Sequence, residues 1–208
     1  MSDALTPYVP RLATEWELEN PGGLWRALDA TCCFVDISGF TALSERLARR
    51  GRIGAEELTE VLNHVFGRML GIAYDKGGSL LKFGGDALLL LFAGDDHAVQ
   101  GAEAAVAMRA ALREARTLPT SVGRLSLRMS TGIHSGNFQF FRVGESHREL
   151  IVAGPAATAT TRMEHGARLF LGGSTSSSDR GAHRPACRRS LLLAVRVVDP
   201  RRGREGPR

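Results

Sequence analysis

Two aspartates stand beside glycine near the ends of apolar runs. Asp36 belongs to the run that begins at Ala30 and lies three residues before Gly39, and Asp86 directly follows a pair of glycines. If the two strands are neighbours, their carboxylates and the backbone carbonyl of Ile37 form an oxygen-rich site. Oxygen ligands of this kind suit Mg²⁺ or Mn²⁺ and not zinc. The pattern therefore predicts that Asp36, Ile37 and Asp86 hold two divalent metal ions, Mg or Mn.

Groups that bind phosphate accompany these carboxylates. The amides of Gly39, Phe40 and Thr41 come at a predicted helix start, where free N–H groups can hold phosphate oxygens. Arg162 follows on a later helix that begins near Pro155, and its guanidinium can bind the oxygens of a polyphosphate. Two metal ions, an anion cradle and a distant arginine together favour phosphoryl-transfer chemistry.

Each of these residues also has an ordinary structural explanation. Asp36 can cap a helix, and Asp86 beside two glycines can simply occupy a hairpin turn. Lys82 can be a solvated strand residue, and Arg162 can be a surface arginine of a helix. Only their occurrence together and in this order favours the functional interpretation.

The hydrophobic periodicity predicts the elements that position these residues. Apolar spacing of three and four residues predicts helices at 41–49, 54–74 and 95–116, and a further helix from about 155. Apolar or alternating runs predict strands at 30–37, 79–83, 87–92, 125–133, 138–143 and 148–153, with turns at 84–86 and 135–137. This mixture predicts an α+β fold with a mixed, largely antiparallel sheet covered by helices on one side.

The chain divides into three regions by composition. Residues 1–27 form a lead-in with proline and glycine, residues 28–167 carry the periodic signals, and residues 168–208 lose them. The last region is polar and rich in arginine, with one apolar stretch at Leu191–Val198 that can form a final strand. The rest of this irregular basic C-terminal tail indicates disorder, or a truncated or altered ending of the domain.

Charge and composition argue against several classes of protein. The formal net charge is +5, but arginines are concentrated from Arg180 onward without interleaved aromatic residues, which argues against specific nucleic-acid binding. No apolar run approaches the ~18 residues of a membrane span, and the acidic start is not a secretory signal. Cys32, Cys33 and Cys187 make a poor disulfide framework, so we expect packed thiols in a cytoplasmic protein.

Three segments in a fixed order, FVDISGFTALSE, LLKFGGDALLLLF and GIHSG, resemble the signature blocks of class III nucleotide cyclases, the adenylyl and guanylyl cyclases. The resemblance covers residues 28–167 and is strongest to the soluble, bicarbonate-responsive adenylyl cyclases. It implies a ferredoxin-like nucleotide cyclase fold and a lyase that converts ATP to cyclic AMP and pyrophosphate in intracellular signal transduction. It also implies a site at a dimer interface, formed by a homodimer or with a second cyclase domain.

The resemblance implies a role for each site residue. Asp36 and Asp86 match the metal-binding aspartates, and Arg162 matches the arginine that stabilises the transition state. Lys82 matches the residue that selects the purine. Since an ammonium group only donates hydrogen bonds, Lys82 suits adenine N1, an acceptor, and not guanine N1–H, a donor.

Two positions depart from the family's pattern. Thr158 stands where the family carries an asparagine four residues before the arginine, and Ile151 stands at the second base-reading position, usually an acid or threonine. Isoleucine cannot accept a hydrogen bond from the adenine amine, so the candidate acceptors are a backbone carbonyl and Glu149. Because losing one preorganised donor slows catalysis by ~10²–10³, a homodimer with Thr158 is expected to be slow.

These departures leave an alternative open. The chain can instead be the metal-supplying or catalytically silent half of an asymmetric cyclase pair, which binds nucleotide or bicarbonate. In that case Lys82 and Arg162 would form the cationic lining of the bicarbonate pocket.

Overall fold

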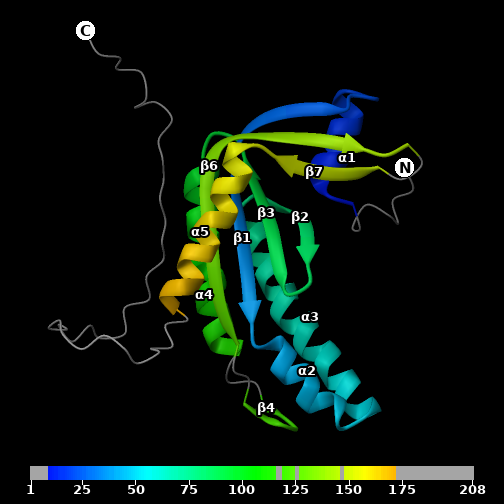
Figure 1. Cartoon of the computed structure of the whole chain (residues 1–208), viewed down its shortest axis with the longest axis vertical. Helices are drawn as coiled ribbons and strands as arrows, with labels where there is room; N and C mark the ends of the chain where they lie inside the picture. The colour runs from blue at the N-terminus through cyan, green and yellow to red at the C-terminus, as the bar shows by residue number, and fades with distance from the viewer. Residues whose placement is uncertain (1–8, 116–118, 125–126, 146–147, 172–208) are drawn as a thin grey trace, which may run out of the picture.

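The computed structural model describes residues 9–115, 119–124, 127–145 and 148–171. Figure 1 shows long strands that bend over at one end, with helices lying along them. The helices are α1 Arg11–Glu19, α2 Phe40–Ala48, α3 Arg52–Asp75, α4 His97–Ala115 and α5 Pro155–Leu171. The strands are β1 Trp25–Ser38, β2 Gly78–Gly84, β3 Ala87–Ala93, β4 Pro119–Thr120, β5 Gly123–Arg124, β6 Arg128–Val143 and β7 Glu149–Ala153.

Five of the strands form one sheet in the order β2-β3-β1-β6-β7. Every pairing in this sheet is antiparallel, and β4 and β5 make a separate antiparallel pair. Helices pack against the sheet, with α5 against β6 and α4 against β1. The predicted α+β fold with a largely antiparallel sheet is confirmed.

β6 is a single strand of 16 residues where the sequence predicts two strands joined by a turn. The predicted turn at 135–137 is wrong, because these residues pair with 29–31 of β1 and the ladder continues on both sides. The glycine in this stretch has a different use. A Cβ at Gly136 would lie 3.4 Å from the Ala156 Cβ, so Gly136 lets α5 approach the strand closely.

Helices cover both faces of the sheet, so the expectation of helices on one side only is wrong. A Cβ on Gly101 of α4 would lie 2.8 Å from the Thr31 side chain of β1. A Cβ on Gly132 of β6 would lie 2.3 Å from the Glu164 nitrogen of α5. Gly132 pairs with Phe34, three positions after Thr31, and successive strand residues alternate between faces. α4 and α5 therefore lie on opposite faces, as Figure 1 also shows.

The two faces carry separate hydrophobic cores. The larger one packs β1 and β3 against α2, α3 and α4, and the smaller one joins α1, β6 and α5. The adjacent residues Cys33 and Cys32 belong to the first and second core respectively, and both are free thiols. Burial raises the pKa of both thiols, that of Cys33 to about 12. The expectation of packed thiols is confirmed for this pair.

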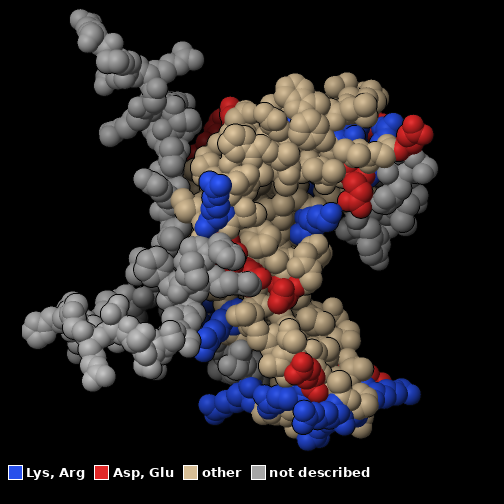
Figure 2. All heavy atoms as spheres, in the orientation of Figure 1, with Lys and Arg blue, Asp and Glu red and all other residues tan. Residues whose placement is uncertain are grey.

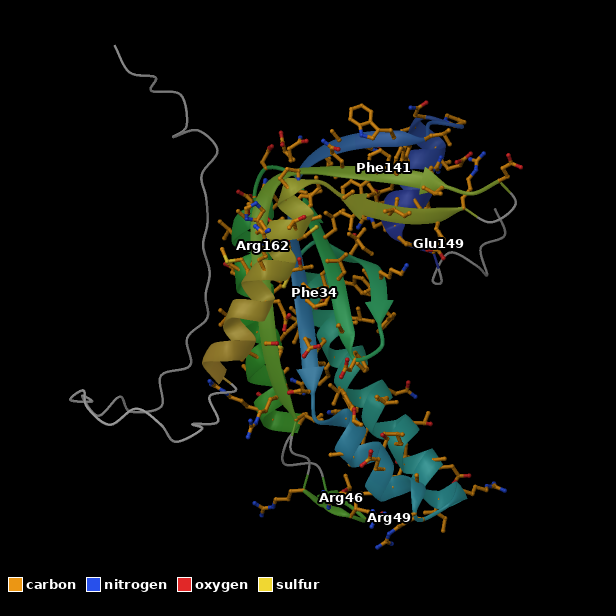
Figure 3. The ribbon with its side chains drawn as sticks, in the orientation of Figure 1. Phe34, Arg46, Arg49, Phe141, Glu149 and Arg162 are labelled. Atoms are coloured by element: carbon orange, nitrogen blue, oxygen red, sulfur yellow. The ribbon has the colours of Figure 1, made fainter. Side chains whose placement is uncertain are left out.

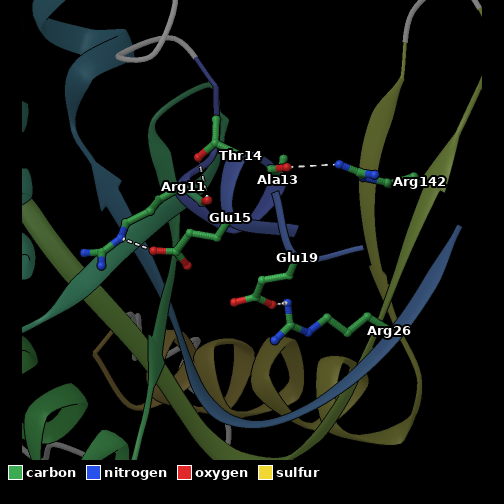
Figure 4. Close-up of polar contacts among 7 residues, drawn as sticks. All are labelled: Arg11, Ala13, Thr14, Glu15, Glu19, Arg26 and Arg142. Carbon is green, nitrogen blue, oxygen red and sulfur yellow. Dashed lines mark hydrogen bonds and ion pairs between the residues drawn. The ribbon is translucent and has the colours of Figure 1, made fainter. Parts of the chain in front are cut away.

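Helix α1 lies in the predicted lead-in and is fastened to the sheet (Figure 4). The buried Arg142 of β6 donates to the Ala13 carbonyl oxygen at 3.0 Å and reaches Glu17 at 2.6 Å. Its guanidinium also lies 5.0 Å from the centre of the Trp16 ring, a cation–π contact. α1 is therefore part of the folded unit, and β1 begins at Trp25. The division of the chain at residues 28 and 168 stays a prediction.

The described helices include none that is long and apolar enough to cross a membrane. α5 extends to Leu171. The predictions for the later tail, including the strand at Leu191–Val198 and the thiol of Cys187, concern positions outside the described residues.

Candidate active site

Asp36 and Asp86 are neighbours at one end of the sheet. Asp36 stands opposite Ala87 in the β1–β3 ladder. The Ile37 N–H donates a hydrogen bond of 3.1 Å to the Asp86 carbonyl oxygen. Asp36 is only 6% exposed, and Asp86 is half-buried. The structure thus brings together the two aspartates that the sequence predicts to act together.

A tight hairpin places Asp86. Gly84 pairs with Ala87, so Gly85 and Asp86 form a two-residue loop between β2 and β3. Gly85 has a φ of 70°, the left-handed conformation that such a hairpin loop requires and that only glycine adopts freely. The glycine therefore sets the geometry, and the aspartate beside it is held next to the end of β1.

The N-terminus of α2 lies directly after the aspartate-bearing strand. Gly39, with a φ of 110°, precedes Phe40, and no side chain caps the helix. The first amides, including those of Phe40 and Thr41, have no acceptor within the helix and are free for an anion. The Phe40 ring stacks on Phe66 with centroids 5.5 Å apart, which fixes the start of the helix. The predicted phosphate cradle therefore lies beside the two aspartates.

The donor set around Asp36 fits divalent ions that are shared with a substrate. Among the residues that the structure describes, no three His, Cys, Asp or Glu side chains converge as a metal site. Two carboxylates and a backbone carbonyl leave coordination positions for water and phosphate oxygens. Mg²⁺ is commonly bound in this way, by one or two carboxylates together with substrate phosphates.

A cavity of about 200 Å³ lies between the two edge strands of the curled sheet. It brings Lys82 of β2 together with Ile151 of β7, the two predicted base-reading residues. Its lining is otherwise apolar and comprises Leu81, Lys82, Leu89, Phe140, Leu150, Ile151 and Val152. A flat, apolar ring with polar edges fits such a pocket.

Glu149, the predicted alternative to an acid at Ile151, lies beside Lys82. The Lys82 Nζ donates to Glu149 Oε2 at 3.3 Å, which connects β2 to β7. Glu149 and Ile151 are two residues apart on one strand, so their side chains leave the strand on the same side. Glu149 itself does not line the cavity, but its bond to Lys82 places its carboxylate beside a residue that does.

Helix α5 carries the remaining predicted residues, Thr158 and Arg162, away from the aspartates. The Thr158 hydroxyl donates to the Gly154 carbonyl oxygen at 3.3 Å. Glu164 faces the sheet, where its carboxylate accepts a 2.6 Å hydrogen bond from Ser130. Two residues along a helix turn by about 200°, so Arg162 projects from the opposite side and is exposed (Figure 3).

A second cavity, of about 390 Å³, lies between the sheet and α5. Thr158 opens into it, and it shares Leu89 and Val152 with the cavity at Lys82. Phe34, near the centre of Figure 3, is part of its wall. The two cavities thus adjoin, with the predicted base-reading residues Lys82 and Ile151 at one side and α5 at the other.

Comparison with known proteins identifies this arrangement. Residues 26–170 match the family profile of the adenylate and guanylate cyclase catalytic domain. The chain belongs to this cyclase family. The match covers every element from β1 to β7 and nearly all of α5.

Relatives of this cyclase domain include proteins named as adenylyl cyclases and proteins named as guanylyl cyclases. Adenylate cyclase type 10 of Oryctolagus cuniculus is 30% identical over 146 residues, which is 68% of this chain but only 9% of that protein. The crystal structure of the guanylyl cyclase Cya2 is 32% identical, covers 70% of this chain and 72% of that chain, and has a TM-score of 0.57. The adenylyl cyclase CyaB from P. aeruginosa is 26% identical over 68% of this chain and 74% of that chain, with a TM-score of 0.56.

One contact beside the candidate cyclase site was not predicted from the sequence. Ser130 stands opposite Asp36 in the β1–β6 ladder and donates to the buried Glu164. This bond ties α5 to the strand beside the aspartates and so fixes the direction of Arg162. The spacing of Thr160 and Glu164, four residues apart on the inner side of the helix, was the available signal.

Proposed function

We propose that this cyclase domain converts ATP to cyclic AMP and pyrophosphate at an interface between two copies of the chain. The proposal rests on one observation: the predicted metal ligands and the predicted catalytic arginine face different directions in one chain. Asp36 and Asp86 lie together at the end of β1, whereas Arg162 points away from the sheet on α5. One chain therefore offers a metal-binding half-site and a separate arginine, and a second copy can complete each of them.

In this proposal the carboxylates of Asp36 and Asp86 and the carbonyl oxygen of Ile37 hold two divalent ions, Mg or Mn. When bound, such ions lower the pKa of the attacking hydroxyl and neutralise the triphosphate. The free amides of Phe40 and Thr41 hold phosphate oxygens at the start of α2. These groups orient the triphosphate so that its α-phosphate faces the ribose.

The reaction is an intramolecular displacement. The 3′-hydroxyl oxygen attacks the α-phosphorus and its proton passes to water, while the bond from the α-phosphorus to the bridging oxygen of pyrophosphate breaks. Arg162 of the second copy donates to the phosphate oxygens as charge develops on them. A guanidinium placed in this way stabilises the transition state more than the ground state.

The cavity at Lys82 supports ATP as the substrate. The Lys82 ammonium donates to adenine N1, and the Glu149 carboxylate accepts from the exocyclic amine. Ile151 contributes only apolar contact with the ring. Guanine would present a donor at N1 to the lysine and a carbonyl to the carboxylate, and both contacts would be repulsive.

A second candidate function rests on Thr158. The Thr158 hydroxyl already donates to the Gly154 carbonyl oxygen, and the threonine side chain is shorter than the asparagine of the family pattern. This observation favours a catalytically silent half that binds nucleotide and supplies the metal site to a different cyclase domain. Bicarbonate binding at Lys82 is less favoured, because the Glu149 carboxylate beside the lysine would repel the anion. A cytoplasmic location, where ATP is present, stays a prediction for either function.

Mixing two inactive variants tests the shared site. Asp36→Asn removes a metal ligand and Arg162→Ala removes the arginine, so each variant alone is expected to be inactive. In an equal mixture, half of the dimers contain one copy of each variant, and each of these has one intact site. About one quarter of the wild-type cyclic AMP production is therefore expected. If the mixture stays inactive while both variants fold and dimerise, the shared homodimeric site is refuted.

A further inference from the structure

Arginines gather at the tip formed by the α2–α3 elbow and the β4–β5 hairpin. We call this surface the arginine tip, and all of its arginines are exposed: Arg46, Arg49, Arg50, Arg52 and Arg124. Figure 2 shows this concentration of basic side chains at the lower end of the molecule, and Figure 3 labels Arg46 and Arg49 there. Acidic residues of α3 also lie nearby: Glu56 pairs with Arg52 at 2.9 Å, and Glu57 is close to Arg50.

The tip is firmly built. α2 ends at Ala48, and a Cβ on Gly54 of α3 would lie 1.9 Å from the Leu47 carbonyl oxygen, so the two helices meet with no space between them. Glu57 of α3 accepts a 2.6 Å hydrogen bond from the Ser121 N–H of the hairpin. The Ser121 hydroxyl also donates to Glu57, and these two bonds, with Arg50 nearby, lower the pKa of the Glu57 carboxyl, so it stays ionised. The arginines are therefore presented by a fixed scaffold.

Much of the charge on the tip is not neutralised within the chain. Arg46, Arg49 and Arg124 have no ion pair or hydrogen bond to another described residue. α3 has no acidic residue in its first turn, although it begins with Arg52. Cations at a helix N-terminus oppose the helix dipole. The dipole of α2 favours Arg46 in its last turn, whereas Arg52 lies against the dipole of α3. Exposed cations that lack a partner among the described residues are expected of a surface that meets an anionic partner.

An exposed aliphatic side chain distinguishes between kinds of anionic partner. Ile53 is 70% exposed and follows Arg52 directly at the elbow. The segments that form the tip, 46–53 and 119–124, contain no aromatic residue that could stack on bases. An isoleucine adds nothing to contacts with the phosphates of a nucleic acid. It gains free energy when it enters the acyl boundary of a bilayer.

We propose that the arginine tip docks this chain on an anionic lipid surface. The guanidinium groups bind lipid phosphates and carboxylates, which they match in geometry, and Ile53 enters the boundary between headgroups and acyl chains. The tip lies at the C-terminal end of α2, and the phosphate cradle lies at the N-terminal end of the same helix. Docking at the tip therefore leaves Asp36 and Asp86 uncovered.

Sedimentation of the full chain with lipid vesicles tests this proposal. Wild-type protein is expected to bind phosphatidylcholine vesicles that contain phosphatidylserine and not phosphatidylcholine alone. The variant R46Q/R49Q/R124Q is expected to lose about fivefold in partition coefficient for each arginine removed. The control variant R11Q/R68Q/R113Q loses the same net charge elsewhere on the exposed surface and keeps the whole C-terminal tail. Its binding is expected to match that of the wild type.

A second variant separates lipid from other polyanions. Ile53→Ser should weaken binding to the anionic vesicles and leave binding to duplex DNA unchanged. Equal losses in the tip variant and the control variant would overturn the proposal, because binding would then follow net charge alone. The proposal would also be overturned if Ile53→Ser bound vesicles as tightly as the wild type while the tip variant bound DNA more weakly. The partner of the arginine tip would then be a nucleic acid and not a lipid surface.

Discussion

The backbone N–H of Ile37 donates a hydrogen bond of 3.1 Å to the carbonyl oxygen of Asp86. This bond joins the end of β1 to the hairpin tip between β2 and β3, 49 positions further along the chain. It brings Asp86 next to the end of β1, where Asp36 pairs with Ala87. Among the described residues, no third His, Cys, Asp or Glu side chain joins the two aspartates. Such a pair of carboxylates suits metal ions that also bind the substrate.

Removing either aspartate should abolish activity without unfolding the chain. Asp36→Asn and Asp86→Asn each replace a charged ligand by a neutral one of the same shape, and a fall in kcat of at least ~10² is expected. The matched control is Asp75→Asn, an exposed aspartate at the end of α3. Manganese-dependent cyclic AMP formation and circular dichroism are the two measurements. Wild-type activity in both site variants, with the fold intact, would contradict the assignment.

The choice of base should depend on Glu149. Replacing it by alanine removes the acceptor for the adenine amine, so kcat/KM for ATP should fall by about ten- to a hundredfold. Turnover of GTP should stay constant or rise, because the carboxylate no longer repels the guanine carbonyl. Glu145→Ala, an exposed acid near the same strand, serves as the control. An equal loss with both nucleotides would show that Glu149 only supports the fold.

Thr158 should limit the rate. Thr158→Asn restores a longer donor on the side of α5 that carries Arg162, and an increase in kcat of about ten- to a thousandfold is expected. KM for ATP should change little, since the donor acts mainly in the transition state. Thr161→Asn on the same helix is the control. No increase from Thr158→Asn, with correct folding, would favour the catalytically silent half.

Stability should fall in mild acid because of His134. This half-buried histidine has an Nδ1 atom without a hydrogen-bond partner among the described residues, and burial lowers its pKa. The unfolded chain then binds a proton more readily than the folded chain. The free energy of unfolding should be constant above a pH of about 6.5 and should decrease below it.

Urea unfolding of the wild type and of His134→Gln, from about pH 7.5 to about pH 5.5, measures this effect. The variant should show a flatter dependence on pH over that interval. Parallel curves for the two proteins would assign the effect to other groups.

Local patterns in the sequence were enough to predict much of the fold. The hairpin with Asp86 at its tip was predicted from two glycines between apolar runs, and α3 was predicted from one-sided apolar spacing. Both features depend on neighbours within the same segment. The α1 helix was missed although Leu12 and Trp16 have helical spacing, because the flanking prolines suggested an irregular lead-in. The turn predicted at 135–137 was wrong because its residues are held extended by β1.

The parts of the site that depend on the curvature of the sheet could not be predicted from spacing. Lys82 and Glu149 lie on opposite edge strands, 67 positions apart, and meet only because the sheet curls. The sequence left Glu149 as one of two candidate acceptors, and the structure places it beside the lysine. The outward direction of Arg162 likewise depends on the bond between Ser130 and Glu164, which connects two elements that are distant in sequence.

The most direct test of the account is cyclic AMP production from ATP by the purified chain with manganese, measured over a wide range of protein concentration. A site shared by two copies predicts that the rate per chain rises with concentration and then levels off as dimers form. It also predicts no product with Asp36→Asn at any concentration. Absence of product from the wild type throughout, or a rate per chain that is independent of concentration while the chain remains monomeric, would contradict a shared catalytic site.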